Sequence, residues 1–251
     1  MHFRAEVYSR KQLGQALENK FIDKVYVPYN LVDESLVNES NRIIIMPPVF
    51  LSDCEKNVYE KMSDLKEIGF SNALVHTIGH IELLGDLNYK LHGGYRLNCT
   101  NTDSVSFLSS SGVQDIIVSP EITSFQINNL KSEIPIGFIS YGYLPLMITR
   151  RCPIKNGKPC NKKNCNRIIK DRMNNDLRVI CSENTAEILN SNVLFLADKL
   201  NKFENASFNV LKFTTEEDIN QIVFAYVNKE QPEFISNFTR GLYFRGVVNQ
   251  V

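Results

Sequence analysis

The strongest constraint on this fold is the repeated order of short apolar runs, each followed by a stretch with helical spacing. Eight such runs occur, and they are rich in β-branched and aromatic residues. This alternation is typical of a parallel sheet with helices packed on it. The predicted strands cover residues 3–8, 24–30, 42–50, 72–79, 91–98, 114–121, 135–142 and 208–213. Eight strand–helix units predict an α/β protein with a closed (β/α)₈ TIM-type barrel.

The helical stretches between these runs support the parallel arrangement. In residues 54–69, for example, Val58, Met62 and Leu65 recur at helical spacing, and the glycine at the end of this stretch suits a helix C-terminus. An open doubly wound sheet is the alternative architecture. It fits less well, because no glycine-rich phosphate loop follows the first predicted strand.

Length and composition are consistent with one cytoplasmic domain. The 251 residues, 43% hydrophobic and 22% charged, suit a single barrel over residues 1–251. No apolar run approaches the roughly 20 residues of a membrane span, and the first residues do not resemble a signal peptide. We therefore expect a cytoplasmic protein without a membrane segment, whose six cysteines are not structural disulfides.

A long insertion, residues 144–205, separates the seventh and eighth predicted strands. Ordered loops of this length are usually functional. In a barrel, a loop that follows a strand lies on the carboxyl-terminal face, where active sites form. No Pro-, Gly- or Ser-rich linker isolates the segment, so we expect it to belong to the barrel domain.

Four of the six cysteines fall in this insertion, with the spacing C-x₇-C-x₄-C-x₁₅-C. They are Cys152, Cys160, Cys165 and Cys181. Four thiolates are the usual ligands of a [4Fe–4S] cluster and also of structural zinc. The spacing matches neither zinc ribbons nor bacterial ferredoxins, so both metals stay open, and unligated thiols are a third reading. Cys54 and Cys99 lie outside the insertion and are expected to be packing residues.

The insertion is also strongly basic. Nine of the chain's 28 Lys and Arg residues lie between Arg150 and Arg172, where Asp171 is the only acid. Such a run offsets the charge of a thiolate-bound metal, or attracts an anionic small molecule or RNA phosphates. The candidate anion-binding residues are Arg150, Arg151, Lys162 and Lys163. A solvated surface is the alternative, and no aromatic residue interrupts the run to stack on bases.

Several segments of the second half carry motifs of a known family. They read YGYLPLMITRRCPI, DRMNNDLRVIC, EILNSNVLFLADKL and FTRGLYFRGV, and the earlier GYRLNCTN and IVSPEIT look like strand-end motifs of the same kind. Together they resemble peptidase family U32, the collagenase-like peptidases. The resemblance implies a barrel and a [4Fe–4S] cluster held by the four cysteines. Better understood relatives are oxygen-independent hydroxylases that act on RNA bases or on a quinone precursor.

One departure from the family pattern affects the expected partners. The usual opening, an apolar strand followed by a loop like APAG, is absent, and the chain reads RAEVYSRKQL instead. The chain is most similar to the second barrel module of longer members. A second U32 module or subunit is therefore an expected partner, besides RNA or an anionic small molecule.

Three polar residues near predicted strand ends are candidate catalytic groups. Glu121 ends the sixth strand and is the best candidate for a general base, and Tyr141, near the end of the seventh, could donate a hydrogen bond. The resemblance implies a substrate- or cluster-facing role for Asn98. Glu121 could instead be a first-turn helix acid, Tyr141 a packing residue and Asn98 a turn residue. His92 begins a strand and is expected to be structural.

Three functions from different classes are consistent with these observations. The first is an iron–sulfur hydroxylase acting on RNA or on a small aromatic or quinone-type substrate. The second is a peptidase, although neither G-x-S-x-G nor H-E-x-x-H occurs. The third is a non-catalytic RNA-binding or assembly module, in which a cluster or zinc shapes the basic loop.

His76 and His80 are four residues apart, but a predicted strand and a glycine disrupt helical spacing, so no metal site is expected there.

Overall fold

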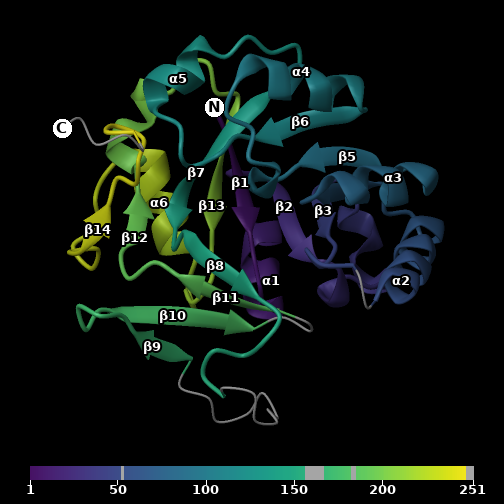
Figure 1. Ribbon diagram of the computed structural model, residues 1–251, viewed down its shortest axis with the longest axis horizontal. Coiled ribbons are helices and arrows are strands. Elements are labelled where there is room, and N and C mark those ends of the chain that lie inside the picture. Colours follow the sequence, from purple (N-terminus) through teal and green to yellow (C-terminus); the bar gives the residue numbers. More distant parts are fainter. Residues whose placement is uncertain (52–53, 156–166, 182–184, 247–251) are drawn as a thin grey trace.

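The computed structural model describes residues 1–51, 54–155, 167–181 and 185–246 (Figure 1). Its barrel strands are β1 (His2–Glu6), β2 (Ile22–Pro28), β3 (Ile43–Met46), β4 (Asn72–Val75), β5 (Lys90–Gly93), β6 (Val113–Ile117), β7 (Ile136–Gly142) and β13 (Phe208–Lys212). All neighbours in this set pair in parallel, and β13 pairs with both β1 and β7. The eight strands therefore form a closed barrel, which confirms the predicted (β/α)₈ fold.

Most of the predicted helices form between these strands. α1 (Arg10–Glu18) begins after Ser9, whose side chain accepts a hydrogen bond from the Gln12 backbone N–H and so caps the helix. The remaining α-helices are α2 (Glu55–Glu67), α3 (Ile78–Asp86), α4 (Thr102–Ser110), α5 (Ser124–Asn129) and α6 (Asn220–Asn228), and the 3₁₀ helices are η1 (Tyr29–Leu31), η2 (Glu34–Glu39), η3 (Tyr95–Leu97) and η4 (Ala197–Lys202). Among the residues that the structure describes, no helix has both the length and the apolar character needed to cross a membrane.

The barrel interior is closely packed. Every residue of β3, β4, β7 and β13 is buried, as expected of a parallel sheet covered by helices. β7 requires Gly137, because a Cβ at this position would lie 2.3 Å from a ring carbon of Phe208. The guanidinium of Arg4 lies 3.5 Å from the centroid of the same ring. The barrel is thus a filled core and not an open channel.

The segment between β7 and β13 forms a second, smaller sheet, which we call the insertion sheet. It contains β8 (Pro145–Thr149), β9 (Ile168–Lys170), β10 (Asp176–Cys181) and β11 (Ala186–Leu189), in the antiparallel order β8-β11-β10-β9. Figure 1 shows this sheet below the barrel, at the carboxyl-terminal ends of β1 and β13. Its own core is small and consists of Val179, Ala186 and Ile188. The insertion therefore covers the barrel face on which active sites form.

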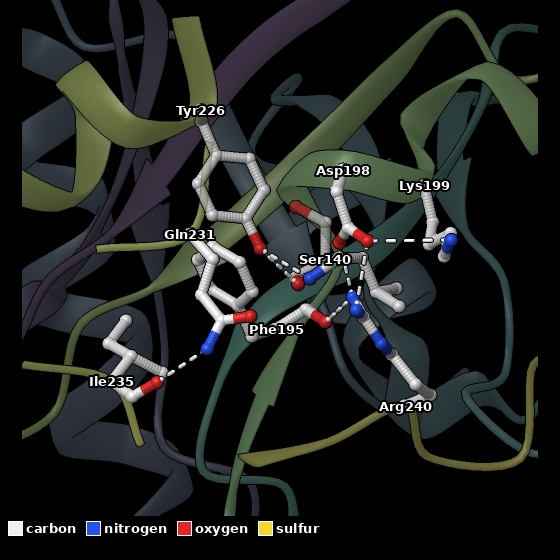
Figure 2. Close-up of polar contacts among 9 residues, drawn as sticks. Ser140, Phe195, Asp198, Lys199, Tyr226, Gln231, Ile235 and Arg240 are labelled. Carbon is white, nitrogen blue, oxygen red and sulfur yellow. Dashed lines mark hydrogen bonds and ion pairs between the residues drawn. The ribbon is translucent and has the colours of Figure 1, made fainter. Parts of the chain in front are cut away.

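Two further strands extend the barrel sheet beyond β7. β12 (Val193–Phe195) pairs with β7 in antiparallel orientation, and β14 (Phe238–Thr239) pairs with β12 in parallel. Figure 2 shows the contacts of Arg240, the residue that follows β14. Arg240 donates to the carbonyl oxygen of Phe195 at 2.8 Å and to Asp198 at 2.9 Å. The chain after α6 is in this way fixed to the barrel wall.

Candidate active site

Two oppositely charged side chains meet at the carboxyl-terminal end of the barrel. Glu6 and Lys212 are the last residues of β1 and β13, and the strand register places them opposite each other. Lys212 Nζ donates to Glu6 Oε1 and, at 2.5 Å, to the hydroxyl of Tyr8. Tyr8 in turn donates to Glu6 Oε1 at 2.5 Å. The side chains of Lys212 and Glu6 are 0% and 3% exposed, so the pair is desolvated and held by its mutual contacts.

The charge states of this triad follow from its contacts. Burial lowers the pKa of Lys212, but Glu6 and the neighbouring tyrosines raise it more, so the net pKa lies well above its ordinary value. Burial, and then the charge of Glu6, raise the pKa of Tyr8 well above its usual range. At neutral pH, Lys212 is therefore a cation and Tyr8 keeps its proton.

A cavity of about 90 Å³ opens beside this triad, and we call it the mouth cavity. Its polar lining residues are Glu6, Tyr8, Asn30, His76, Tyr95, Arg96, Thr185 and Glu187, and its less polar wall consists of Pro28, Tyr29, Met46, Pro47, Pro48 and Val49. Most of these residues lie at or just after the ends of β1 to β5, and two come from the insertion. An apolar wall with a few convergent polar groups is typical of a ligand site.

An ion pair lines the cavity on the insertion side. Arg96, in η3 after β5, donates to Glu187 Oε1 on β11 at 2.7 Å, and each side chain is 14% exposed. One oxygen of each cavity carboxylate is buried without a hydrogen-bond partner among the described residues, namely Glu6 Oε2 and Glu187 Oε2. Unpaired buried acceptors are costly unless water or a ligand donates to them.

The two neighbouring histidines are held in the neutral form. His76 follows β4, and its backbone N–H donates to His80 Nδ1 in α3 at 3.1 Å. Burial, helped by the positive charge of Arg96, lowers the pKa of His76 well below its ordinary value. Burial also lowers the pKa of His80 to about 4. Neither ring therefore adds positive charge to the mouth cavity at neutral pH.

A second, larger cleft of about 490 Å³ separates the insertion sheet from the barrel rim. Cys181 and Arg178 of β10 line one side, and residues 214–217 after β13 line the other. Tyr8 lines both this cleft and the mouth cavity. The end of β10 that carries Cys181 is therefore a close neighbour of the mouth cavity.

Only part of the predicted cysteine site lies within the described residues. Cys152 and Cys181 are half-buried, whereas Cys160, Cys165, Lys162 and Lys163 lie outside the described residues. Among the described residues, no group of three or more His, Cys, Asp or Glu side chains is placed to hold a metal. Arg150 and Arg151 follow β8 and are exposed. The metal site and the anion site thus stay predictions.

The three candidate catalytic residues lie away from the mouth cavity. Tyr141 is buried and donates to Glu216 at 2.9 Å, and burial raises its pKa. Asn98 has a left-handed backbone with φ of 50°, and its side chain accepts from Ser119 at 2.8 Å. Glu121 is exposed in the turn before α5. None of the three is among the residues that line the mouth cavity.

Other polar residues inside the barrel form a separate layer nearer its amino-terminal end. His92 Nδ1 lies 2.9 Å from Asp115, which also accepts from Arg4 at 2.8 Å. All three side chains are less than a tenth exposed. These contacts agree with a structural role for His92. Cys99 is fully buried, as expected of a packing residue.

Sequence reasoning missed the residues that do line the mouth cavity. Glu6 and Lys212 end the first and last barrel strands, and their inward direction is the only signal that could have singled them out. A charged residue at an inward position of a predicted barrel strand must find a partner or a ligand. The pairing of Arg96 with Glu187, by contrast, depends on how the insertion folds back, which no local pattern indicates.

Comparison with known proteins gives one family match. The sequence pattern of peptidase family U32 matches residues 38–228, which run from η2 to the end of α6. No curated protein matches this chain. Among solved structures, the chain is similar to the U32 peptidase Mk0906, at 10% sequence identity and a TM-score of 0.47, over 86% of this chain and 94% of that chain.

Proposed function

Because this chain belongs to peptidase family U32, we propose that it is an iron–sulfur enzyme that hydroxylates its substrate without molecular oxygen. In this proposal Cys152, Cys160, Cys165 and Cys181 hold a [4Fe–4S] cluster, and the mouth cavity receives the reacting group of an RNA or of a small aromatic or quinone-type molecule. The reducing cytosol is the compartment that suits such thiolate ligands.

The observation that carries this proposal is the register of the insertion sheet. Cys181 pairs with Ala186, and Ala186 pairs with Thr149, so two strand spacings, about 10 Å, separate Cys181 from the end of β8. Cys152 follows that end by three residues. Arg167 is the first described residue after residue 155, and its carbonyl oxygen accepts a hydrogen bond from the backbone N–H of Val179 at 2.7 Å. Val179 lies two residues before Cys181.

This arrangement fits a thiolate-ligated group. The described residues that flank the segment with Cys160 and Cys165 are Thr149, three residues before Cys152, and Arg167, and both lie toward the end of β10 that carries Cys181. Four thiolates gathered at this end would be a suitable donor set for a cluster. The basic residues around them offset the negative charge of such a ligand set.

The chain's own residues suggest how a substrate would be held near this edge. When bound, the cluster would supply the redox chemistry, or an iron site for an oxygen-containing donor. Tyr8, which lines both the cleft of Cys181 and the mouth cavity, keeps its proton between Lys212 and Glu6. Arg96 and Glu187 form an ion pair in the wall of the cavity on its insertion side.

A peptidase mechanism receives less support from the described residues. Such a mechanism needs a nucleophile next to a base, or an activated water. In the described part of the chain, no serine or cysteine donates to a histidine ring, and His92 contacts Asp115 and Asn72 instead.

Anaerobic purification of the full chain tests the proposal. We expect a brown protein that absorbs at about 400 nm and contains iron and sulfide. Replacing Cys181 with Ser should remove most of the iron, whereas Cys54→Ser, a change at another half-buried cysteine, should leave it. A colourless protein that contains zinc, or full iron content in Cys181→Ser, would contradict the proposal.

A further inference from the structure

The outer edge of β8 in the insertion sheet has no strand beside it. β8 stands at one end of the sheet order β8-β11-β10-β9. In the described part of the chain its partner strand is β11, and no backbone–backbone hydrogen bond outside that pairing involves residues 145–149. Its sequence, PLMIT, carries no charge, and Leu146 and Met147 are 58% and 57% exposed. An exposed, uncharged and apolar strand edge is a template for pairing with another strand.

The other strand edges within the described residues are protected. β9, at the opposite side of the insertion sheet, has three residues, and Lys170 at its end pairs with Asp176 at 3.3 Å. β14, the last strand of the barrel sheet, has two residues and is followed by Arg240. Short length and charge are common means of protecting an edge, and β8 has neither. This difference singles out β8 as an edge to which a partner strand can add.

A second copy of the same strand matches this edge. If two β8 strands pair antiparallel about a two-fold axis at Met147, the middle residue, the two Met147 side chains face each other. Leu146 then lies opposite Ile148 of the second copy, so each exposed apolar side chain gains an apolar neighbour. Pro145, which has no N–H, comes opposite Thr149 at the ends of the pairing, and the start of an edge strand tolerates proline.

The charges that follow β8 also allow this pairing. Arg150 and Arg151 come directly after the strand. In the two-fold arrangement they lie opposite Leu144 and Tyr143 of the second copy, and not opposite its arginines. An aromatic ring is a favourable neighbour of a guanidinium, and Arg178 of the same chain already lies 4.9 Å from the centroid of the Tyr143 ring. Like charges therefore stay at opposite ends of the strand pair.

We propose that the chain forms a symmetric dimer through the outer edges of two β8 strands. The dimer joins the two insertion sheets, of four strands each, into one continuous antiparallel sheet. This goes beyond the proposed function and does not depend on a cluster, because β8 contains no cysteine and lines no part of the mouth cavity. Because Ile148 pairs with Glu187, the dimer also stabilises the strand that contributes the ion pair with Arg96.

The size of the contact sets the expected affinity. Two strands of five residues bury less surface than a standard protein interface. The dimer should therefore be weak, with a Kd of about 10–100 μM. Its contact is apolar and made by backbone hydrogen bonds, so it should persist at about 1 M salt, which screens association between exposed charges.

Sedimentation of the full chain in reducing buffer measures the association at about 1–300 μM. The mass should rise with concentration toward twice that of the monomer. Met147→Lys should weaken the dimer at least about tenfold, because two lysines then face each other on the two-fold axis. Met173→Lys, at an 82% exposed methionine in the turn between β9 and β10, is the matched control and should leave the dimer unchanged.

An exchange of charge tests the position of the two-fold axis. Met147→Glu alone should weaken the dimer as Met147→Lys does, for the same reason. An equimolar mixture of the two variants should associate again, since residue 147 of one copy faces residue 147 of the other. Circular dichroism of each variant checks that the fold is kept, as expected for a substitution at an exposed side chain.

Hydrogen exchange locates the contact on the unaltered chain, without any substitution. The amides of β8 should exchange more slowly at about 300 μM than at about 1 μM, whereas those of β9 should not change. A monomer over the whole concentration range, dissociation of the dimer by salt, or a dimer that leaves exchange in β8 unaltered would each overturn the proposal. So would a dimer that tolerates Met147→Lys, or a mixture of the Lys and Glu variants that stays monomeric.

Discussion

The barrel and the insertion sheet differ in the size of the buried apolar core that each has. Every residue of β7 and β13 is buried, and the barrel strands share one continuous core with the surrounding helices. The insertion sheet has three buried apolar residues, and β8 and β9 are half-exposed or exposed throughout. The barrel therefore has an extensive core of its own, whereas the insertion sheet has little. Its order should therefore respond to ligands and metals that leave the barrel unchanged.

A pair of core truncations gives the largest expected contrast. Phe208→Ala removes a fully buried ring that packs against Gly137 and Arg4, and should reduce the free energy of unfolding by about 3–5 kcal/mol. Ile188→Ala, in the small insertion core, should leave global unfolding nearly unchanged and accelerate hydrogen exchange in β10 and β11. Chemical denaturation and hydrogen exchange measure the two effects. Equal global losses would show that the two regions form one cooperative unit.

Acid should weaken the barrel through His80. Its pKa is about 4 in the folded chain, because of burial, against 6.5 ordinarily, so below pH 6.5 the unfolded chain binds a proton that the folded chain does not. The free energy of unfolding should thus fall between pH 6.5 and about 4, by up to about 3 kcal/mol for this group. Denaturation of the unaltered chain and of His80→Gln over this range isolates the contribution. His2→Gln, at an exposed histidine, should keep the full dependence, and an unchanged slope in His80→Gln would contradict the prediction.

The ion pair between the two regions should contribute a smaller amount. Arg96→Gln leaves Glu187 partly buried without its cation and should reduce the stability of the attached insertion sheet by about 1–2 kcal/mol. Hydrogen exchange of β11 should quicken, while that of β3 and β4 stays unchanged. Arg42→Gln, at an ion pair within the barrel, is the control and should not affect β11. Protection of β11 that persists in Arg96→Gln would show that other contacts hold the sheet.

The smallest expected effect concerns the basic surface of the insertion. If the chain binds RNA there, the affinity should fall with salt, because neutralised phosphates release counterions. Replacing Arg150 and Arg151 with Ala should reduce the slope of log affinity against log salt by about 1–2. The same change at Lys90 and Lys131, exposed residues of the barrel, should leave the slope unaltered. Binding that is absent or independent of salt would favour a solvated surface without this role.

The sequence was sufficient for the barrel because each strand–helix unit carries a local pattern. The run over residues 43–46 is apolar at every position and is buried at every position in β3. Asn is a favoured residue at a helix N-cap, and the side chain of Asn101 caps α4 by accepting a hydrogen bond from the backbone N–H of Ser104. Apolar runs and helix caps depend on residues that are close in sequence, so they could be predicted without knowing the three-dimensional structure.

The mouth cavity could not be predicted, because its groups come together only in the folded chain. Glu6 and Lys212 are 206 positions apart, and Arg96 meets Glu187 only because β11 folds back over the barrel. Strand-end position favoured Tyr141 and Glu121; Tyr141 donates to Glu216 and Glu121 is exposed, so neither lines the mouth cavity. The direction of a side chain at a strand end depends on twist and on the next loop, and local patterns do not encode either.

The contact between β1 and β13 also has a consequence for the order in which the chain folds. The first strand cannot pair with this neighbour until the chain has been synthesised through Lys212, so the barrel stays open until then. In that period Glu6 and Lys212 are hydrated and separate, and burying them becomes favourable only when both arrive together. Barrel closure and the burial of this pair should thus be one late step, and such long-range closure is typical of slow folding.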